Sequence, residues 1–174
     1  KDIDISLGNF RTDYIDLYQI HNPSMENLDR ILAEGGALEA LMEAKEAGKI
    51  GHIGLTAHST EVFERALSLD FVETIMFPYN IVEFQGTELM KKAAEKNVAF
   101  IDMKPLAGGA IEDGRLALRY ICSNPDVTVV IPGMYSVDEA KKNIEAVLDD
   151  SHITEEEKAG FEKVREELGE NFCR

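Results

Sequence analysis

A histidine at the end of an apolar run is the first residue in this chain whose type and position suit catalysis. His21 closes the stretch Tyr14–Pro23, YIDLYQIHNP, in which β-branched, aromatic and aliphatic residues predict a strand and Asn22-Pro23 ends it. An imidazole at a strand end beside a cleft can donate a hydrogen bond to a carbonyl oxygen or transfer a proton near neutral pH. The residue types leave a second interpretation open, in which His21 is a buried, hydrogen-bonded histidine of the core.

Two glycine-containing loops are of a type that binds anions. The first is Leu106-Ala107-Gly108-Gly109, and the second is Pro132-Gly133, after which Ser136 begins a helix. Glycine lets backbone N–H groups approach an anion, and a helix N-terminus adds the positive end of its dipole. The alternative is that the glycines only make tight turns and Ser136 only caps its helix. Both loops follow the last two predicted strands, which favours a phosphate site.

Lys104 offers a different chemistry, because a desolvated lysine can form a Schiff base with a carbonyl substrate. A solvated or ion-paired lysine is the alternative. His58 has no partner that the sequence identifies, and His52 and His152 are interpreted as incidental. No His, Cys, Asp or Glu spacing matches a metal site.

These residues must be positioned by strands and helices that alternate about five times with short connections. The expected strands are Tyr14–His21, Ile50–Leu55, Phe71–Phe77, Val98–Met103 and Val127–Ile131. They are apolar throughout, as in a parallel sheet covered on both faces, and none is followed by Gly-x-Gly-x-x-Gly. A closed β/α barrel needs eight strands and typically about 250 residues. The sequence therefore predicts an α/β fold of the TIM-barrel type, here a partial barrel of about five parallel strands with covering helices and a C-terminal helix.

The helices are predicted from apolar periodicity and end signals. The expected helices are Asp4–Phe10, Ala37 to Gly48, Val62–Leu67, Leu89–Ala94, Arg115–Ser123, one from Ser136 to Leu148, and Thr154–Leu168. Ser136/Glu139 and Thr154/Glu157 have the capping-box spacing. The residues expected to be buried by the helix after Ser136 are Val137, Ala140, Ile144, Val147 and Leu148. Asn22–Gly36 is expected to be a long loop, residues 1–150 the partial barrel, and residues 151–174 a C-terminal helix and the start of a tail.

Charge and composition limit the partners and the location. The formal net charge of −15 excludes nucleic acid and anionic membrane surfaces as bulk partners. No apolar run reaches the roughly 20 residues that cross a bilayer, and the first residues carry no signal-peptide pattern, so the expected location is cytoplasmic. Two cysteines, Cys122 and Cys173, suit a reducing compartment. Because Lys1 begins an incomplete helix, we expect the chain to be a piece of a longer protein.

Five motifs in order resemble the aldo-keto reductase family. They are Asp13 to His21 (DYIDLYQIH), Gly48 to Thr56 (GKIGHIGLT), Phe77 to Asn80 (FPYN), Lys104 to Gly109 (KPLAGG) and Val130 to Met134 (VIPGM). Members are eight-stranded TIM barrels that transfer hydride from a nicotinamide cofactor, usually NADPH, to aldehydes and ketones. The resemblance implies that this chain corresponds to strands four to eight, and that its substrate is a small carbonyl compound.

The resemblance also implies which catalytic residues are present. The family uses an aspartate, a tyrosine that acts as general acid, a lysine that lowers the pKa of that tyrosine, and a histidine that orients the carbonyl. Only the histidine has a counterpart here, at His21, so we expect the chain alone to lack normal turnover.

The cofactor residues implied by the resemblance include several departures. The Ser-Asn pair that holds the carboxamide corresponds to Thr56 and Ala57, the Gln of the sixth strand to Met76, and the Tyr that often stacks on nicotinamide to Met103. Tyr135 stands where many members have an arginine for the 2′-phosphate, which leaves NADP and NAD both open. The remaining expected cofactor residues are Leu106, Gly108, Gly133, Met134, Ser136 and Asn143.

Other interpretations remain. The tail Glu170–Arg174 is similar to the start of a ferredoxin-like cysteine cluster, but iron–sulfur centres take about four thiolates, so a cluster is expected only in a longer parent chain. A non-catalytic half-barrel that binds a nucleotide or a partner is the alternative function, with self-association through open sheet edges. A Schiff-base lyase at Lys104 is a third.

Overall fold

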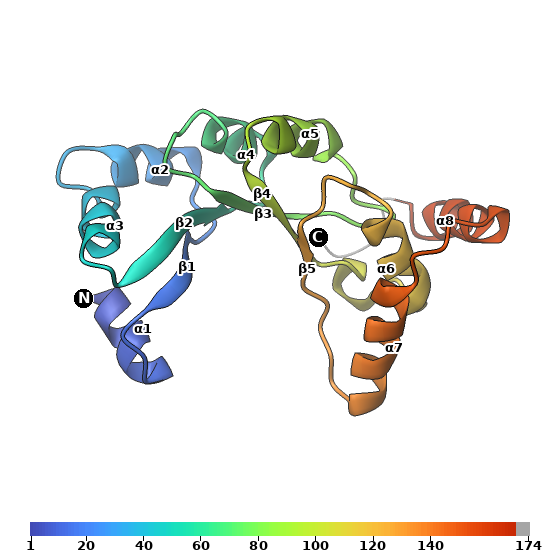
Figure 1. The fold of residues 1–174 in the computed structure, drawn as a ribbon. Coiled ribbons are helices and arrows are strands. Elements are labelled where there is room, and N and C mark those ends of the chain that lie inside the picture. Colours follow the sequence, from blue (N-terminus) through green and yellow to red (C-terminus); the bar gives the residue numbers. More distant parts are fainter. Residues whose placement is uncertain (170–174) are drawn as a thin grey trace.

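The computed structural model describes residues 1–169, in which a single parallel sheet has helices along one face (Figure 1). The strands are β1 (Ile15–Ile20), β2 (Ile50–Thr56), β3 (Thr74–Pro78), β4 (Ala99–Met103) and β5 (Val129–Val130). The helices are α1 (Asp2–Phe10), α2 (Met25–Leu32), α3 (Ala37–Glu46), α4 (Thr60–Ala66), α5 (Thr87–Glu95), the 3-10 turn η1 (Ala107–Gly109), α6 (Gly114–Cys122), α7 (Val137–Leu148) and α8 (Glu155–Leu168). None of the helices among residues 1–169 is both long and apolar enough to span a bilayer.

The sheet has the order β1-β2-β3-β4-β5 and every pairing is parallel. Sequential order with helical crossovers is the arrangement of consecutive units in a β/α barrel. The predicted partial barrel of about five parallel strands is therefore confirmed. Within residues 1–169, β1 pairs only with β2 and β5 only with β4, so both are edge strands.

The core lies between the sheet and its helices. Ile53, Leu55, Ile75, Phe77 and Phe100 point to the helix-covered face and are at most 1% exposed. Gln19, Gly54 and Thr74 are paired with one another in the register and lie on the opposite face of the sheet, because residues opposite each other in a ladder point the same way. This second face corresponds to the inside of a barrel.

A second, smaller core joins η1, α6 and α8. Its buried residues are Ile81, Ala107, Ile111, Ala117 and Phe161. Thr154 and Glu157 form the predicted capping box at the start of α8. The division of the chain at residue 150 stays a prediction.

Three expectations about local structure were wrong. Asn22–Gly36 is not one loop, because α2 lies inside it, capped by Ser24, whose hydroxyl accepts from the amide of Asn27 at 3.2 Å. β5 has two residues instead of the expected five, although the amides of Thr128 and Ile131 extend the hydrogen bonding toward β4. β3 begins at Thr74 and not at Phe71.

The largest difference concerns α7. Val137, Ile144, Val147 and Leu148, which were expected to be buried, are 71%, 58%, 47% and 75% exposed. Ala146 is the buried residue of this helix. Among residues 1–169, α7 packs against α6, and no element covers its apolar side.

Candidate functional site

The C-terminal end of β1 places His21 at the rim of the sheet, where its side chain is exposed. The next residue, Asn22, has a left-handed backbone with φ of 40°. Its amide donates a 2.8 Å hydrogen bond to the hydroxyl of Thr56 at the end of β2. Thr56 is 7% exposed, so a buried hydroxyl fixes the turn that follows His21.

His58 and Lys104 lie close to His21 at the same rim. Partial burial and the positive charge of Lys104 lower the pKa of His58, with a smaller contribution from His21 and an opposing one from Glu83. Lys104 is half-buried and makes no ion pair within the described part of the chain. The sequence did not identify this neighbourhood for His58, because it depends on the distance between loops of different β/α units.

The loop after β4 is held by buried polar side chains. Asn80 is fully buried and donates to the carbonyl of Lys104 and to the carboxylate of Glu83, both at 2.9 Å. The amide of Tyr79 donates to Asp102 Oδ1 at 2.9 Å. Burial raises the pKa of Asp102 to about 8, against the opposing effect of the Tyr79 amide. These contacts tie the ends of β3 and β4 together.

The two expected methionines lie on the inner face of the sheet. Met76 pairs with Thr56 in the register, and Met103 pairs with Pro78. Paired residues share a face, and Met103 lies two residues after Ile101, the partner of Met76, so Thr56, Met76 and Met103 all lie on the inner face toward the rim. Both methionines are half-buried. A thioether can pack against an aromatic ring but replaces none of the hydrogen bonds of an amide or a phenol.

The glycine loop after β4 has an unusual backbone. Lys104 and Ala107 have φ of 57° and 48°, and Gly108 and Gly109 have φ of 69° and 96°. Positive φ is costly for residues other than glycine and clusters at functional sites. Among residues 1–169, the amides of Ala107 and Gly109 close turns, whereas the amides of Leu106 and Gly108 have no hydrogen-bond acceptor. Unpaired backbone amides of this kind can bind an anion.

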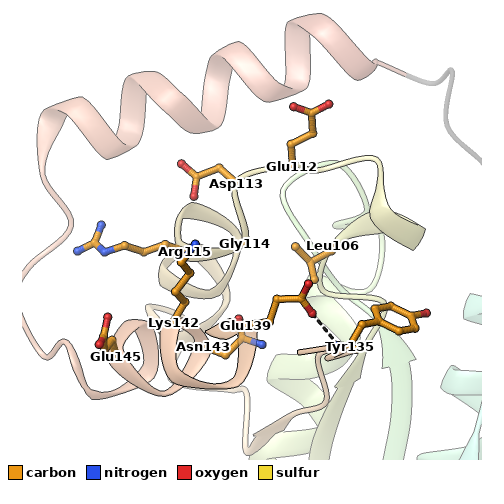
Figure 2. Close-up of a pocket in the computed structure, with 11 residues that line it drawn as sticks. Leu106, Glu112, Asp113, Gly114, Arg115, Tyr135, Glu139, Lys142, Asn143 and Glu145 are labelled. Atoms are coloured by element: carbon orange, nitrogen blue, oxygen red, sulfur yellow. Dashed lines mark hydrogen bonds between the residues drawn. The ribbon is translucent and has the colours of Figure 1, made fainter. Parts of the chain in front are cut away.

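A cavity of about 710 Å³ lies beside this loop, between the starts of α6 and α7 (Figure 2). Its lining residues are Leu106, Glu112, Asp113, Gly114, Arg115, Gly133, Tyr135, Glu139, Lys142, Asn143 and Glu145. Leu106, Gly133 and Asn143, which were expected to bind the cofactor, are thus brought together from two loops and a helix. The volume is within the range of small-molecule sites.

The other expected site residues lie outside the cavity lining. Gly108 belongs to the adjoining loop, and Met134 and Ser136 flank the lining residue Tyr135. Thr56, Met76 and Met103 lie on the inner face, and His21 lies at the end of β1. The expected site residues therefore fall into two groups. One lies on the inner face and at the end of β1, and the other lies at or beside the cavity at the starts of α6 and α7.

The charged residues of the cavity were missed from the sequence. Arg115 lies in α6, and Lys142 lies in α7 next to Asn143, which was expected to bind the cofactor. Glu139 was interpreted as half of a capping box. Ser136 does cap the helix, accepting from the amide of Glu139 at 3.1 Å, but the Glu139 carboxylate instead accepts from the amide of Tyr135 at 2.6 Å.

The arrangement can bind an elongated, phosphate-containing ligand along the rim. The loop after β4 supplies the amides of Leu106 and Gly108, which are unpaired within residues 1–169, and the cavity supplies a neighbouring compartment with polar walls. The loops after the last two strands are where β/α barrels commonly bind phosphate. Among the described residues, no group of three His, Cys, Asp or Glu side chains could hold a metal ion.

The sheet order and the parallel pairing define a partial β/α barrel. The model of the aldo/keto reductase family matches residues 1–116, which is more than half of the chain. The chain belongs to the aldo/keto reductase family.

Relatives support this assignment. L-galactose dehydrogenase of Arabidopsis thaliana is 26% identical over 184 residues, which cover 84% of this chain and 57% of that protein. Aldo-keto reductase YhdN of Bacillus subtilis is 33% identical over 97 residues, which cover 56% of this chain and 28% of that protein. The chain thus spans less than two thirds of the length of these relatives.

The fold is that of solved aldo-keto reductases. The holo form of aldo-keto reductase AKR11C1 from Bacillus halodurans superposes with a TM-score of 0.77 at 25% identity, covering 94% of this chain and 65% of that chain. The thermostable aldo-keto reductase Tm1743 superposes with a TM-score of 0.72 at 21% identity. The expected iron–sulfur link receives no support from these proteins, and Cys173 lies outside the described residues.

Proposed function

We propose that this chain carries the cofactor-binding part of an NAD(P)H-dependent reductase that converts small aldehydes or ketones to alcohols. The observation that carries the proposal is the cavity beside the loops after β4 and β5, lined by Leu106, Gly133 and Asn143. Family membership supplies the class of reaction. When bound, the nicotinamide cofactor supplies the hydride.

The residues of the chain fit such a cofactor in three places. The unpaired amides of Leu106 and Gly108 suit the pyrophosphate. The cavity, with Met134 and Ser136 at its edge, suits the adenosine end. On the inner face, Met76 and Met103 provide an apolar wall for the nicotinamide. The hydroxyl of Thr56 already accepts from Asn22 and retains its own proton for donation to the carboxamide.

His21 is the proposed catalytic residue of this chain. Its imidazole is exposed at the rim, where it can donate a hydrogen bond to the oxygen of a small carbonyl substrate. The family resemblance assigns the proton donor, a tyrosine, and its aspartate and lysine partners to other strands. We therefore expect the chain by itself to bind cofactor weakly and to reduce no carbonyl.

A titration of the 174-residue chain with NADH and with NADPH tests the proposal, with nicotinamide fluorescence as the readout of binding. Gly133→Phe should fill the cavity and abolish binding. Gly133→Ala is the matched control, because a Cβ at Gly133 meets no heavy atom within 4 Å. Binding to Gly133→Phe that equals wild type would place the cofactor elsewhere, and rapid aldehyde reduction by this chain would overturn the assignment of the missing catalytic residues.

The second candidate function is a non-catalytic half-barrel that binds a partner or a second copy. The favouring observation is the exposed apolar side of α7 together with the exposed Val129 and Ile131 at the β5 edge, 46% and 44% exposed. Unpaired edge strands invite pairing with another chain. Analytical ultracentrifugation tests this: a monomer at micromolar concentration would rule out self-association through these edges.

A further inference from the structure

We infer that the adenosine compartment of this chain selects a nucleotide with a free 2′-hydroxyl, and therefore NAD(H) over NADP(H), with Glu139 as the specificity-determining residue. The inference rests on the proposed cofactor site and goes beyond it. The family usually uses NADPH, so the assignment comes from the contacts and charges of this particular cavity.

Glu139 contacts the backbone of Tyr135. Glu139 Oε2 accepts from the amide of Tyr135 at 2.6 Å, in the turn just before α7. The hydroxyl of Ser136 accepts from the amide of Glu139 at 3.1 Å. A 2′-phosphate at a helix start would need such amides as donors. Here the carboxylate and hydroxyl of the chain itself already occupy two of them.

The cavity wall has more acidic than basic residues. Four lining residues are acidic, Glu112, Asp113, Glu139 and Glu145, and two are basic, Arg115 and Lys142. α7 also has Asp138 beside Glu139 in its first turn. A 2′-phosphate carries about 1.5 to 2 negative charges at neutral pH. The excess of acidic over basic residues in the lining therefore disfavours a 2′-phosphate.

Arg115 does not compensate for these carboxylates. Its guanidinium forms an ion pair with Asp149 at 2.6 Å and a longer one with Glu157 at 3.5 Å. Figure 2 shows the Arg115 side chain directed away from Glu139 and Tyr135. A phosphate would have to compete with both carboxylates for Arg115.

Lys142 is the lining cation that makes no ion pair in the described part of the chain. It lies three residues after Glu139 in α7, so the two side chains share one side of the helix. A phosphate that reached Lys142 would also face the Glu139 carboxylate. A ribose hydroxyl, in contrast, can donate to the second oxygen of Glu139, which is the way acidic residues recognise the 2′-hydroxyl of NAD.

The test measures binding to the 174-residue chain with two probe pairs, so that the adenosine end is read separately from the nicotinamide. The first pair is NADH and NADPH, followed by fluorescence, and the second is 5′-AMP and adenosine 2′,5′-bisphosphate, followed by calorimetry. Wild type should bind the probe with the free 2′-hydroxyl at least about tenfold more tightly in each pair, the order expected for one unscreened like-charge contact.

Glu139→Gln should reduce that ratio to about one, because a glutamine oxygen can still accept from Tyr135 but carries no charge. Glu145→Gln removes the same charge from the far side of the cavity and should lower the ratio clearly less than Glu139→Gln does. Equal effects of the two variants, or tighter binding of the 2′-phosphorylated probes to wild type, would overturn the role of Glu139. Absence of binding by all four probes would overturn the cofactor site itself and this inference with it.

Discussion

The amide of Asn22 donates a 2.8 Å hydrogen bond to the hydroxyl of Thr56, so the turn after the His21 strand is anchored to the end of the neighbouring strand. Thr56→Val removes the acceptor while keeping the shape of the side chain. We expect a loss of about 1–3 kcal/mol in the free energy of unfolding, because the Asn22 amide loses its acceptor in a partly buried position. Urea denaturation measures the loss.

Thr56→Ser keeps the hydroxyl and serves as the control for this prediction. It should retain most of the stability lost by Thr56→Val, and it should retain nicotinamide binding where Thr56→Val weakens it. Equal stability of the valine and serine variants would show that the contact to Asn22 contributes nothing measurable.

The strands and the rim could be predicted because they depend on local patterns. β2 runs from Ile50 to Thr56, one residue beyond the expected end, since a mainly apolar run between Gly48 and the polar loop defines it. The positions of His21 and of the glycine loops at the rim were predicted because these residues directly follow predicted strands. Each of these features is encoded within about ten residues of the chain.

The exposure of α7 and the walls of the cavity could not be predicted in this way. Periodicity correctly indicated a helix with an apolar side at Val137 and Ile144, but periodicity does not say whether another element covers that side. Glu139 matched a capping box by spacing, yet its carboxylate binds the amide of Tyr135, one residue before the cap. The direction of a long charged side chain depends on which neighbours are in reach.

Asp102 should make the stability of the protein fall as the pH rises. Burial raises its pKa from 3.8 to about 8, and its Oδ2 has no hydrogen-bond partner within the described residues. Between these two values the folded state binds more protons than the unfolded state, so the free energy of unfolding decreases with pH and levels off above about 8. Urea denaturation of wild type from pH 4.5 to 9.5 measures this decrease.

Asp102→Asn provides the matched comparison, since the asparagine oxygen can still accept from the amide of Tyr79. The stability of Asp102→Asn relative to wild type should increase from pH 4.5 to about 8 and stay constant above it. A stability difference that is the same at pH 4.5 and pH 9.5 would mean that Asp102 ionises as easily in the folded protein as in the unfolded chain.

Arg119 should contribute strongly to stability at neutral pH and less in acid. It is 4% exposed and donates to Glu157 at 2.9 Å and to the carbonyl of Ser151 at 2.8 Å. The hydrogen bond from Arg119 lowers the pKa of Glu157 from 4.5 to about 2, so its stabilising effect is present above 4.5 and is lost as the pH falls through about 2. Arg119→Gln should cost about 1.5–3 kcal/mol at pH 7, because the partly buried Glu157 carboxylate loses its charged hydrogen bond from Arg119 and keeps only the longer ion pair to Arg115.

The exposed pair of Lys158 and Glu155, 2.7 Å apart, gives the control for Arg119. Lys158→Gln should change the unfolding free energy by about 0–1 kcal/mol, as for other surface ion pairs. The cost of Arg119→Gln should shrink between pH 5 and pH 2.5, measured by urea denaturation at both. A cost that is equal at the two pH values would assign the stability to packing of Arg119 and not to its charge.

Gly54 on the inner face should not tolerate a side chain. A Cβ there would overlap with Thr74 Oγ1 and would lie 3.1 Å from Gln19 Cγ and 3.2 Å from Leu17 Cδ1. Gly54→Ala should therefore cost about 1–3 kcal/mol through overpacking. Thr74→Ala should relieve most of this cost, because Thr74 Oγ1 is buried without a hydrogen-bond partner within the described residues and its removal breaks no contact of its own.

A double-mutant cycle in urea measures the coupling, with Gly8→Ala in α1 as the control, since nothing lies within 4 Å of a Cβ at that position. Full stability of Gly54→Ala, or a double variant no more stable than Gly54→Ala, would contradict the close packing of Gly54 against Thr74.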